Sequence, residues 1–178
     1  MGYTENLLSR IRNSDDWPAF ERPDFLDELN AVADNAFSKD SIEGYLASML
    51  IYHQVSEEML RLLISDTQFF IQLAVFPAEL NFPTQSKMTY GDVIKYLTDA
   101  ISFKNKEELI YKAQELNRIR IELVHKLTSQ TGLADIKNFV VVAKAIHDEM
   151  FRLFEEAHDY FRVCFHDFYK DTFIDYEE

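Results

Sequence analysis

The stretch LADIKNFVVVAKAIHDEMFRLFEEAHDYFRVCFHDFY, residues 133–169, contains neither proline nor glycine. A helix can therefore run through all of it, over about 36 residues and about 54 Å at 1.5 Å per residue. Apolar side chains recur along it at alternating spacings of four and three residues, which is typical of a helix that packs lengthwise against its neighbours. The seam consists of Met150, Phe154, Ala157, Phe161, Cys164 and Phe168. This part of the chain is therefore expected to form the long C-terminal helix of a bundle.

The rest of the chain is also poor in residues that make turns. Of its 178 residues four are glycine and four are proline, and all the prolines lie in the first 83 residues. They mark two connections, at residues 13–23 and 76–89, and the segments between connections have helical spacing of apolar residues. We expect one domain over residues 1–178, an all-α bundle of about six or seven helices. Helices within residues 3–38 are expected to pack on a core at about residues 41–170.

Capping patterns indicate where individual helices begin and end. Ser41 can cap a helix that runs to about Ser65. Asn105 and Glu108 have the spacing of a capping box that opens a later helix. Gly132 stands where a left-handed cap or a turn would end that helix.

Aromatic residues also occupy other faces of the C-terminal helix, and one helix cannot easily bury all of them within its own monomer. They are Phe151, Tyr160, Phe165, Tyr169, Phe173 and Tyr176. Such residues form either a thick aromatic core or a surface for self-association, since aromatic side chains are enriched at buried interfaces. Both interpretations stay open at this stage, and a homodimer is the expected state.

The distribution of charge limits the partners. The net charge is -13, which argues against general affinity for long polyanions. However, residues 81–130 contain eight Lys or Arg and six Asp or Glu, whereas residues 147–178 contain three bases and ten acids. A phosphate is therefore repelled least by residues 81–130. The single cysteine and the absence of an 18-residue apolar run favour a cytoplasmic protein that has no membrane partner.

Residues 115–128, ELNRIRIELVHKLT, place an arginine inside an apolar stripe. On a helix, Arg118 lies near Glu122 and is expected to be solvated, whereas Arg120 lies at the centre of the stripe. An unpaired buried charge costs several kcal/mol, so Arg120 must meet a carboxylate, a water-filled cleft or an anionic ligand. His125 lies about 140° further around the helix, at the edge of the stripe. One interpretation is a buried Arg–carboxylate pair that ties helices together, with His125 an incidental boundary residue.

This motif resembles the signature of the HEPN superfamily, in which four to six residues separate an arginine from a histidine on one helix. The matching residues are Arg120 and His125, within LNRIRIELVHKL on the penultimate helix of an all-helical chain. The resemblance covers about residues 41–170 and extends to mannitol-repressor-like relatives. It implies a helical bundle that dimerises and brings both copies of the two side chains to one cleft.

The resemblance implies two classes of function. In metal-independent endoribonucleases of toxin or defence type, Arg120 would contact the scissile phosphate and His125 would assist proton transfer at the ribose 2′-hydroxyl, leaving a 2′,3′-cyclic phosphate. Other members bind a nucleotide, RNA or an antitoxin-like protein, or regulate transcription. The residue after the arginine is usually polar in the family and here is Ile121, which favours a regulatory or interaction module without catalysis.

The remaining histidines suggest no metal or cofactor site. Glu155 and His158 have the spacing of half a di-iron motif, but His53 and Glu57, the nearest second candidates, have the wrong spacing. We expect Glu155 and His158 to be surface neighbours. His147, which precedes an acid, is expected to be solvated.

Overall fold

The structure is a computed structural model that describes residues 3–18, 24–130 and 132–172. This part of the chain contains six α-helices and no strand. The helices are α1 Tyr3–Arg12, α2 Asp24–Phe37, α3 Ile42–Val75, α4 Tyr90–Asp99, α5 Lys106–Lys126 and α6 Leu133–Thr172. The predicted all-α bundle with a long C-terminal helix is therefore confirmed.

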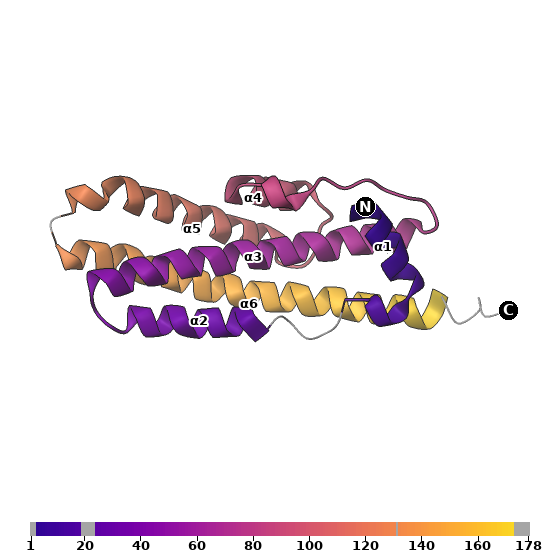
Figure 1. The fold of residues 1–178 in the computed structure, drawn as a ribbon, viewed down its shortest axis with the longest axis horizontal. Helices are drawn as coiled ribbons and strands as arrows, with labels where there is room; N and C mark the ends of the chain where they lie inside the picture. The colour runs from indigo at the N-terminus through magenta and orange to yellow at the C-terminus, as the bar shows by residue number, and fades with distance from the viewer. Residues whose placement is uncertain (1–2, 19–23, 131, 173–178) are drawn as a thin grey trace.

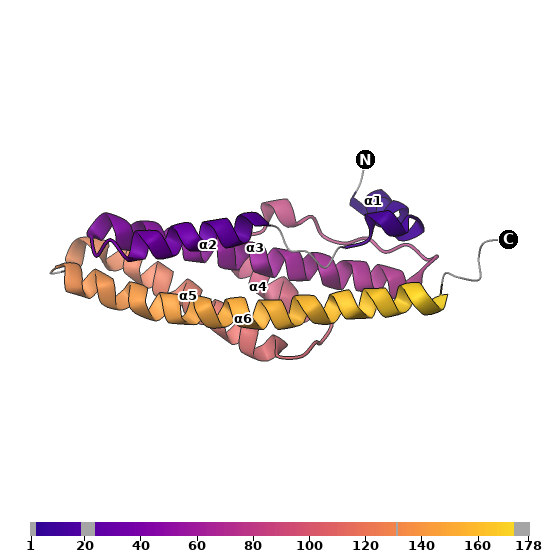
Figure 2. The same ribbon diagram turned by 90° about the horizontal axis from the view of Figure 1, so that it is seen from below.

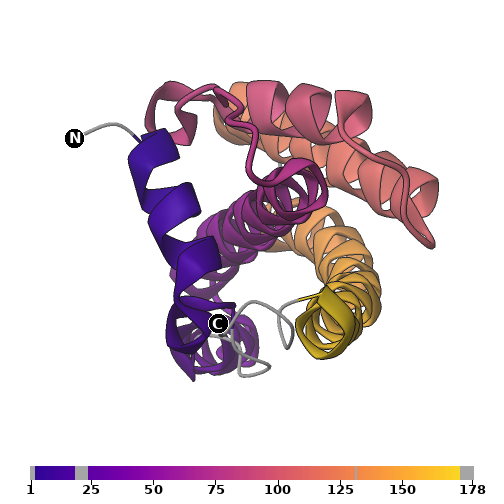
Figure 3. The ribbon, with the colours of Figure 1, turned by 90° about the vertical axis from the view of Figure 1, so that its right-hand side faces the viewer.

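Helices α2, α3, α5 and α6 lie lengthwise beside one another (Figure 1), and α3 packs against the other three. α3 and α6 start at the same end of the bundle, whereas α2 and α5 run in the opposite direction. α4 covers part of α3 and α5, and α1 packs on the far end of α3 (Figure 2). Seen end-on, α4 and α5 form one side of the molecule and α2 the other (Figure 3).

Helices begin where the caps predict, directly after Ser41 and Asn105, but three details of the predicted helix ends differ. The Ser41 hydroxyl accepts a hydrogen bond from the Gly44 N–H at 3.1 Å, as expected, but α3 continues past Ser65 to Val75. Asn105 precedes α5 with φ at 62°, and its side chain donates to Glu156 of α6 at 2.8 Å instead of capping the helix. Gly132 does not have a positive φ. A short 3₁₀ turn, Leu127–Ser129, follows α5 instead.

Several aromatic residues of α6 are buried within the monomer. Phe154, Phe161 and Phe165 are each at most 2% exposed, and Phe165 packs edge-on against Phe69 of α3 with ring centroids 4.9 Å apart. The long α3 supplies the surface that a single helix lacks, so Phe165 belongs to a thick aromatic core. Phe151 is half-buried and Tyr160 is 49% exposed, so these two residues do not exclude a surface for self-association. The side chains of residues 168–178 lie outside the described part.

The C-terminal end of α4 is held by a buried lysine. Lys106 is 8% exposed, and its Nζ donates to the carbonyl oxygens of Thr98 at 2.8 Å and Ala100 at 2.6 Å. Burial lowers the pKa of Lys106, while the negative charge of Asp99 opposes this effect. The ammonium satisfies carbonyl groups that the helix end leaves without partners, and it joins α4 to the start of α5. Among the helices described, none combines the length and apolarity that a membrane span requires.

Candidate functional site

Arg120 and His125 both lie on the exposed surface of α5. The expectation that Arg120 sits in a buried stripe is therefore wrong, although Leu116 and Leu123 of that stripe are buried. Arg118 is exposed as expected, 3.9 Å from Glu122. Among the residues described, no carboxylate forms an ion pair with Arg120.

Arg120 reaches solvent because α4 covers only part of α5. Beyond the start of α4 at Tyr90, the side of α5 that faces away from α6 is uncovered (Figure 1). Val124 and Ile121 in this last part of α5 are 60% and 40% exposed. The buried face of α5 there consists of Ile119 and Leu123 instead.

Arg120 and His125 do not point in the same direction. Five residues along an α-helix correspond to about 140° of rotation and about 7.5 Å of rise. Ile121 and Val124 lie in the arc between the two side chains, so an exposed aliphatic strip separates the guanidinium from the imidazole. Within one copy of the chain, the side chains of Arg120 and His125 therefore do not face a common recess.

The buried neighbour of Arg120 is His53 of α3. His53 is 4% exposed and packs against the ring of Tyr90, with centroids 4.4 Å apart. Burial lowers the pKa of His53, and the positive charge of Arg120 lowers it further, while Glu57 and the Asn117 amide partly offset both effects. A neutral imidazole is the state this environment favours.

His53 and Tyr90 both carry unsatisfied polar atoms. Neither ring nitrogen of His53 nor the Tyr90 hydroxyl has a hydrogen-bond partner within the described residues. Burial, with the nearby charge of Glu57, raises the pKa of Tyr90, so its hydroxyl stays protonated. His53 and Tyr90 are therefore a buried polar pair, and Arg120 lies close enough to His53 for its charge to affect the histidine.

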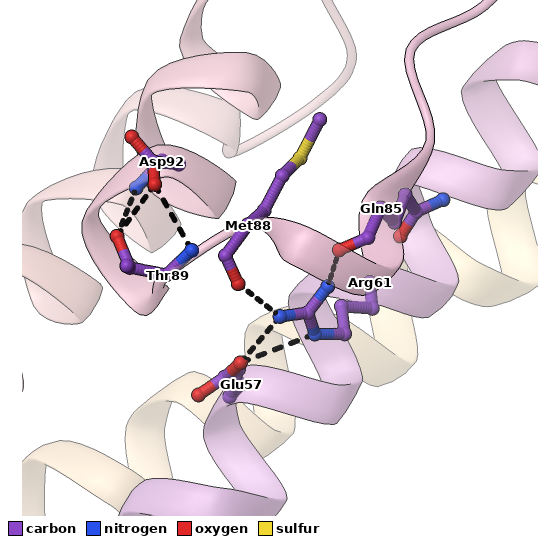
Figure 4. A network of polar contacts seen from close by, with 6 residues as sticks. All are labelled: Glu57, Arg61, Gln85, Met88, Thr89 and Asp92. Atoms are coloured by element: carbon purple, nitrogen blue, oxygen red, sulfur yellow. Dashed lines mark hydrogen bonds and ion pairs between the residues drawn. The ribbon is translucent and has the colours of Figure 1, made fainter.

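A guanidinium holds the segment before α4 against α3 (Figure 4). Arg61 of α3 donates to the carbonyl oxygens of Gln85 at 2.6 Å and Met88 at 2.7 Å, and pairs with Glu57 at 2.6 Å. Directly afterwards, Thr89 and Asp92 form a capping box at the start of α4. These contacts fix the position of Tyr90 over His53.

His147 is fully buried, so the expectation that it is solvated is wrong. Its Nε2 lies 2.9 Å from Asn30 Oδ1 of α2, and its Nδ1 lies 2.9 Å from Ser56 Oγ of α3. Since Oδ1 can only accept, Nε2 carries the proton and Nδ1 accepts from the Ser56 hydroxyl. Burial lowers the pKa of His147 to about 4. The three groups tie together α2, α3 and α6, and no solvent reaches the imidazole.

His158 is also buried rather than a surface neighbour of Glu155. Its Nδ1 lies 3.4 Å from Asp66 Oδ2, and the other carboxylate oxygen accepts from Arg162 at 2.7 Å. No group of three His, Cys, Asp or Glu side chains in the described residues has an arrangement that could hold a metal ion. His158 is therefore a packed residue of the core beside the Asp66–Arg162 pair, not a surface group.

The sequence interpretation missed the contribution of His53. Its position within an apolar helix, three residues after the exposed Leu50 and four before Glu57, carries no motif. The sequence shows only that a polar residue lies on an otherwise apolar helix face. Such a residue more often makes hydrogen bonds within the core than it binds a ligand. Its neighbour Asn117 comes from the same stretch as Arg120, but nothing in the spacing indicates that α3 lies opposite.

Comparisons of the chain with models of protein families, with curated proteins and with solved structures find no match.

Proposed function

We propose that this chain is a HEPN-like regulatory or interaction module, that it acts as a homodimer, and that it holds an anionic ligand of nucleotide size at Arg120. The observation that carries the proposal is the exposure of Arg120 on an acidic chain, beside exposed aliphatic side chains and without an ion pair among the described residues. An arginine that served only to tie helices together would be buried against a carboxylate.

The exposed aliphatic residues support self-association through α3 and α5. Leu50 of α3 and Val124 of α5 are each 60% exposed. The two helices are antiparallel, so the turn before His53 on α3 lies beside the turn after Arg120 on α5. Grouped exposed apolar side chains are typical of interfaces. A second copy placed around a two-fold axis would cover both residues with the same patch of its own surface.

Such a dimer would also create the anion site. A two-fold axis near Val124 brings two Arg120 side chains toward each other, and the guanidinium groups repel unless an anion lies between them. A phosphate accepts hydrogen bonds from both planar groups. One nucleotide needs few cations, so the overall acidity of the chain opposes its binding much less than the binding of long RNA.

The position of His125 favours binding over cleavage. General acid–base catalysis requires the imidazole within hydrogen-bond reach of the reacting oxygen. In one copy of the chain, Val124 and Ile121 separate His125 from Arg120 along the helix surface. Ile121, which stands where the resembling family usually has a polar residue, adds an exposed apolar group at this point.

Light scattering tests the dimer. We expect wild-type protein at micromolar concentration to have a mass of about 42 kDa, twice the 21.0 kDa of one chain. Val124→Glu places two like charges in the interface and should reduce the mass to that of one chain. Val163→Glu, which changes a valine of similar exposure on α6, should stay dimeric. If the wild-type protein has the mass of one chain at this concentration, the proposed dimer is wrong.

Calorimetric titration with nucleoside monophosphates tests the anion site. Binding should be lost in Arg120→Ala and kept in Arg12→Ala, which removes an exposed arginine from α1. Equal binding by wild type and Arg120→Ala would contradict the role of Arg120.

A metal-independent endoribonuclease is the second candidate function, because Arg120 and His125 are both exposed to solvent. Incubation of purified protein with RNA in EDTA, beside Arg120→Ala and His125→Ala, separates the candidates. If the wild type cleaves RNA to 2′,3′-cyclic phosphate ends and both substitutions abolish this activity, the protein is a nuclease and not a non-catalytic module. If the wild type does not cleave RNA, the result supports the non-catalytic module.

A further inference from the structure

A long groove runs between α4 and α5. It consists of two adjoining cavities of about 660 Å³ and 640 Å³, which share Thr98 and Gln114 in their walls. One wall is the face of α4 from Gly91 to Thr98. The other is a continuous face of α5 from Glu107 to Glu122, in which residues recur at spacings of three and four. From Glu107 to Glu122 the helix rises by fifteen steps of 1.5 Å, so this wall is about 22 Å long, which matches about seven residues of extended polypeptide.

The two ends of the groove have opposite charges. At the Gly91 end, Lys95 of α4 and Arg118 of α5 stand on opposite walls. The carboxylate of Glu122 in the same cavity pairs with Lys126 at 2.6 Å and lies 3.9 Å from Arg118. Glu107 and Glu108 line the far end, where the ammonium of Lys106 is already bound to the carbonyl oxygens of Thr98 and Ala100. A ligand that fits both ends therefore carries an anionic group toward Gly91 and a cationic group toward Glu107.

Two carboxamides line the middle of the groove, Gln114 and Asn117, three residues apart on the same face of α5. The Asn117 amide lies close enough to His53 to affect its pKa, so Gln114 is the carboxamide that a ligand in the groove would meet. Within the part of the chain described, the Gln114 amide makes no hydrogen bond. A carboxamide offers both donor and acceptor groups, as a peptide group does. An extended segment leaves its backbone groups available for such partners, whereas the backbone of a helix is already satisfied.

Two exposed apolar side chains stand at the rims. Tyr111 is 55% exposed and lies in the acidic half, and Ile121 is 40% exposed and lies in the basic half. Tyrosine is among the residues that contribute most to binding at protein interfaces, because it buries a large area with few rotatable bonds. The groove thus has an anchoring position in each half.

We infer that the groove between α4 and α5 binds an extended segment of a partner polypeptide, about seven residues long, with an acidic side chain between Lys95 and Arg118 and a basic side chain near Glu107. The mixed charge favours a polypeptide over nucleic acid, which would place phosphates beside Glu107. The inference does not rest on the dimer or on Arg120, since neither Arg120 nor Val124 lines the groove.

Selection from a random heptapeptide library displayed on phage, against the immobilised wild-type protein, tests the inference. Enriched sequences should carry Asp or Glu near one end and Lys or Arg near the other. A synthetic peptide of the most enriched sequence should bind in fluorescence anisotropy, and Lys95→Glu and Arg118→Glu should each weaken this binding by about tenfold or more. Lys87→Glu makes the same charge change outside the groove and should leave the affinity within about twofold of wild type.

A charge exchange completes the test. Replacing the acidic residue of the peptide by lysine should abolish binding to the wild type and restore binding to Lys95→Glu. Circular dichroism of each variant checks folding, and Lys95 is exposed, so its substitution should preserve the fold. Enrichment of no peptide, or of peptides that bind Lys95→Glu as tightly as wild type, would overturn the inference. Light scattering on the same variants reports the dimer separately.

Discussion

Arg162 of α6 and Asp66 of α3 form a buried ion pair, with Arg162 Nη1 2.7 Å from Asp66 Oδ1 and side chains 7% and 5% exposed. His158 lies on the other side of the carboxylate. The pair joins the two longest helices of the bundle in the half that contains the aromatic core. Because a buried pair loses its hydration on folding, its presence alone is weak evidence of stabilisation. Removing one partner has a much larger effect.

We therefore expect Asp66→Ala to lower the free energy of unfolding by about 3–5 kcal/mol, since it removes a buried carboxylate that contacts the buried guanidinium of Arg162 at 2.7 Å. Urea unfolding measures the change. The combined variant Asp66→Leu with Arg162→Met, which has no buried charge at either position, should be clearly more stable than Asp66→Ala. The exposed pair Lys137–Asp40 supplies the control, because Lys137→Ala should leave the unfolding midpoint close to that of wild type. An unchanged midpoint in Asp66→Ala would show that the pair does not form.

The buried His147 should make stability depend on pH. Its pKa is about 4 in the folded protein against an ordinary value of 6.5. Between these values the unfolded chain binds more protons, so the free energy of unfolding falls as the pH drops from 6.5 to 4, by about 3 kcal/mol in total. Above pH 6.5 this contribution is fully present. Urea unfolding at several pH values measures this effect. Between pH 6.5 and 4 the free energy of unfolding should fall less for His147→Gln than for wild type. An equal fall in both proteins would contradict the lowered pKa of His147.

The sequence predicts the helices well because the information for them is local. The seam of residues 150–161 and the absence of glycine and proline after Gly132 are sufficient to predict α6. The cap at Ser41 is likewise a contact between neighbours in the chain. The cap predicted at Asn105 fails because its amide instead binds Glu156, 51 residues away. No pattern near Asn105 contains that partner.

The candidate site depends on packing that a helical wheel does not represent. A wheel places Arg120 at the centre of an apolar stripe, but its exposure is decided by where α4 begins, at Tyr90. The same limit explains His147 and His158, whose neighbouring acids in the sequence suggest solvated groups. Their actual partners, Ser56 and Asp66, come from α3.

Two glycines should respond in opposite ways to alanine. A Cβ at Gly44 would lie 2.3 Å from the carbonyl oxygen of Ala36, a backbone atom that can move only if the end of α2 shifts. Gly44→Ala should therefore lower the free energy of unfolding by about 1–3 kcal/mol. At Gly91 the nearest atom is 3.9 Å away, so Gly91→Ala should be neutral or stabilise α4 by up to about 1 kcal/mol. Thermal unfolding of both variants makes the comparison, and equal effects would show that α2 and α3 do not approach so closely.

Arg61 should control the order of the segment before α4. Its guanidinium contacts Glu57 and two carbonyl oxygens at once, and the single ammonium of a lysine cannot reproduce this planar arrangement. In Arg61→Lys we expect faster amide hydrogen exchange over residues 84–92 and a loss of about 1–3 kcal/mol in unfolding free energy.

The control is Arg152→Lys, at an arginine that contacts two glutamates on the exposed side of α6. This variant should leave the exchange rates of residues 84–92 unchanged. Since the same segment sets Tyr90 over His53, Arg61→Lys should also weaken nucleotide binding at Arg120 if the proposed site is correct. Wild-type exchange rates in Arg61→Lys would show that the network in Figure 4 does not hold the segment in solution.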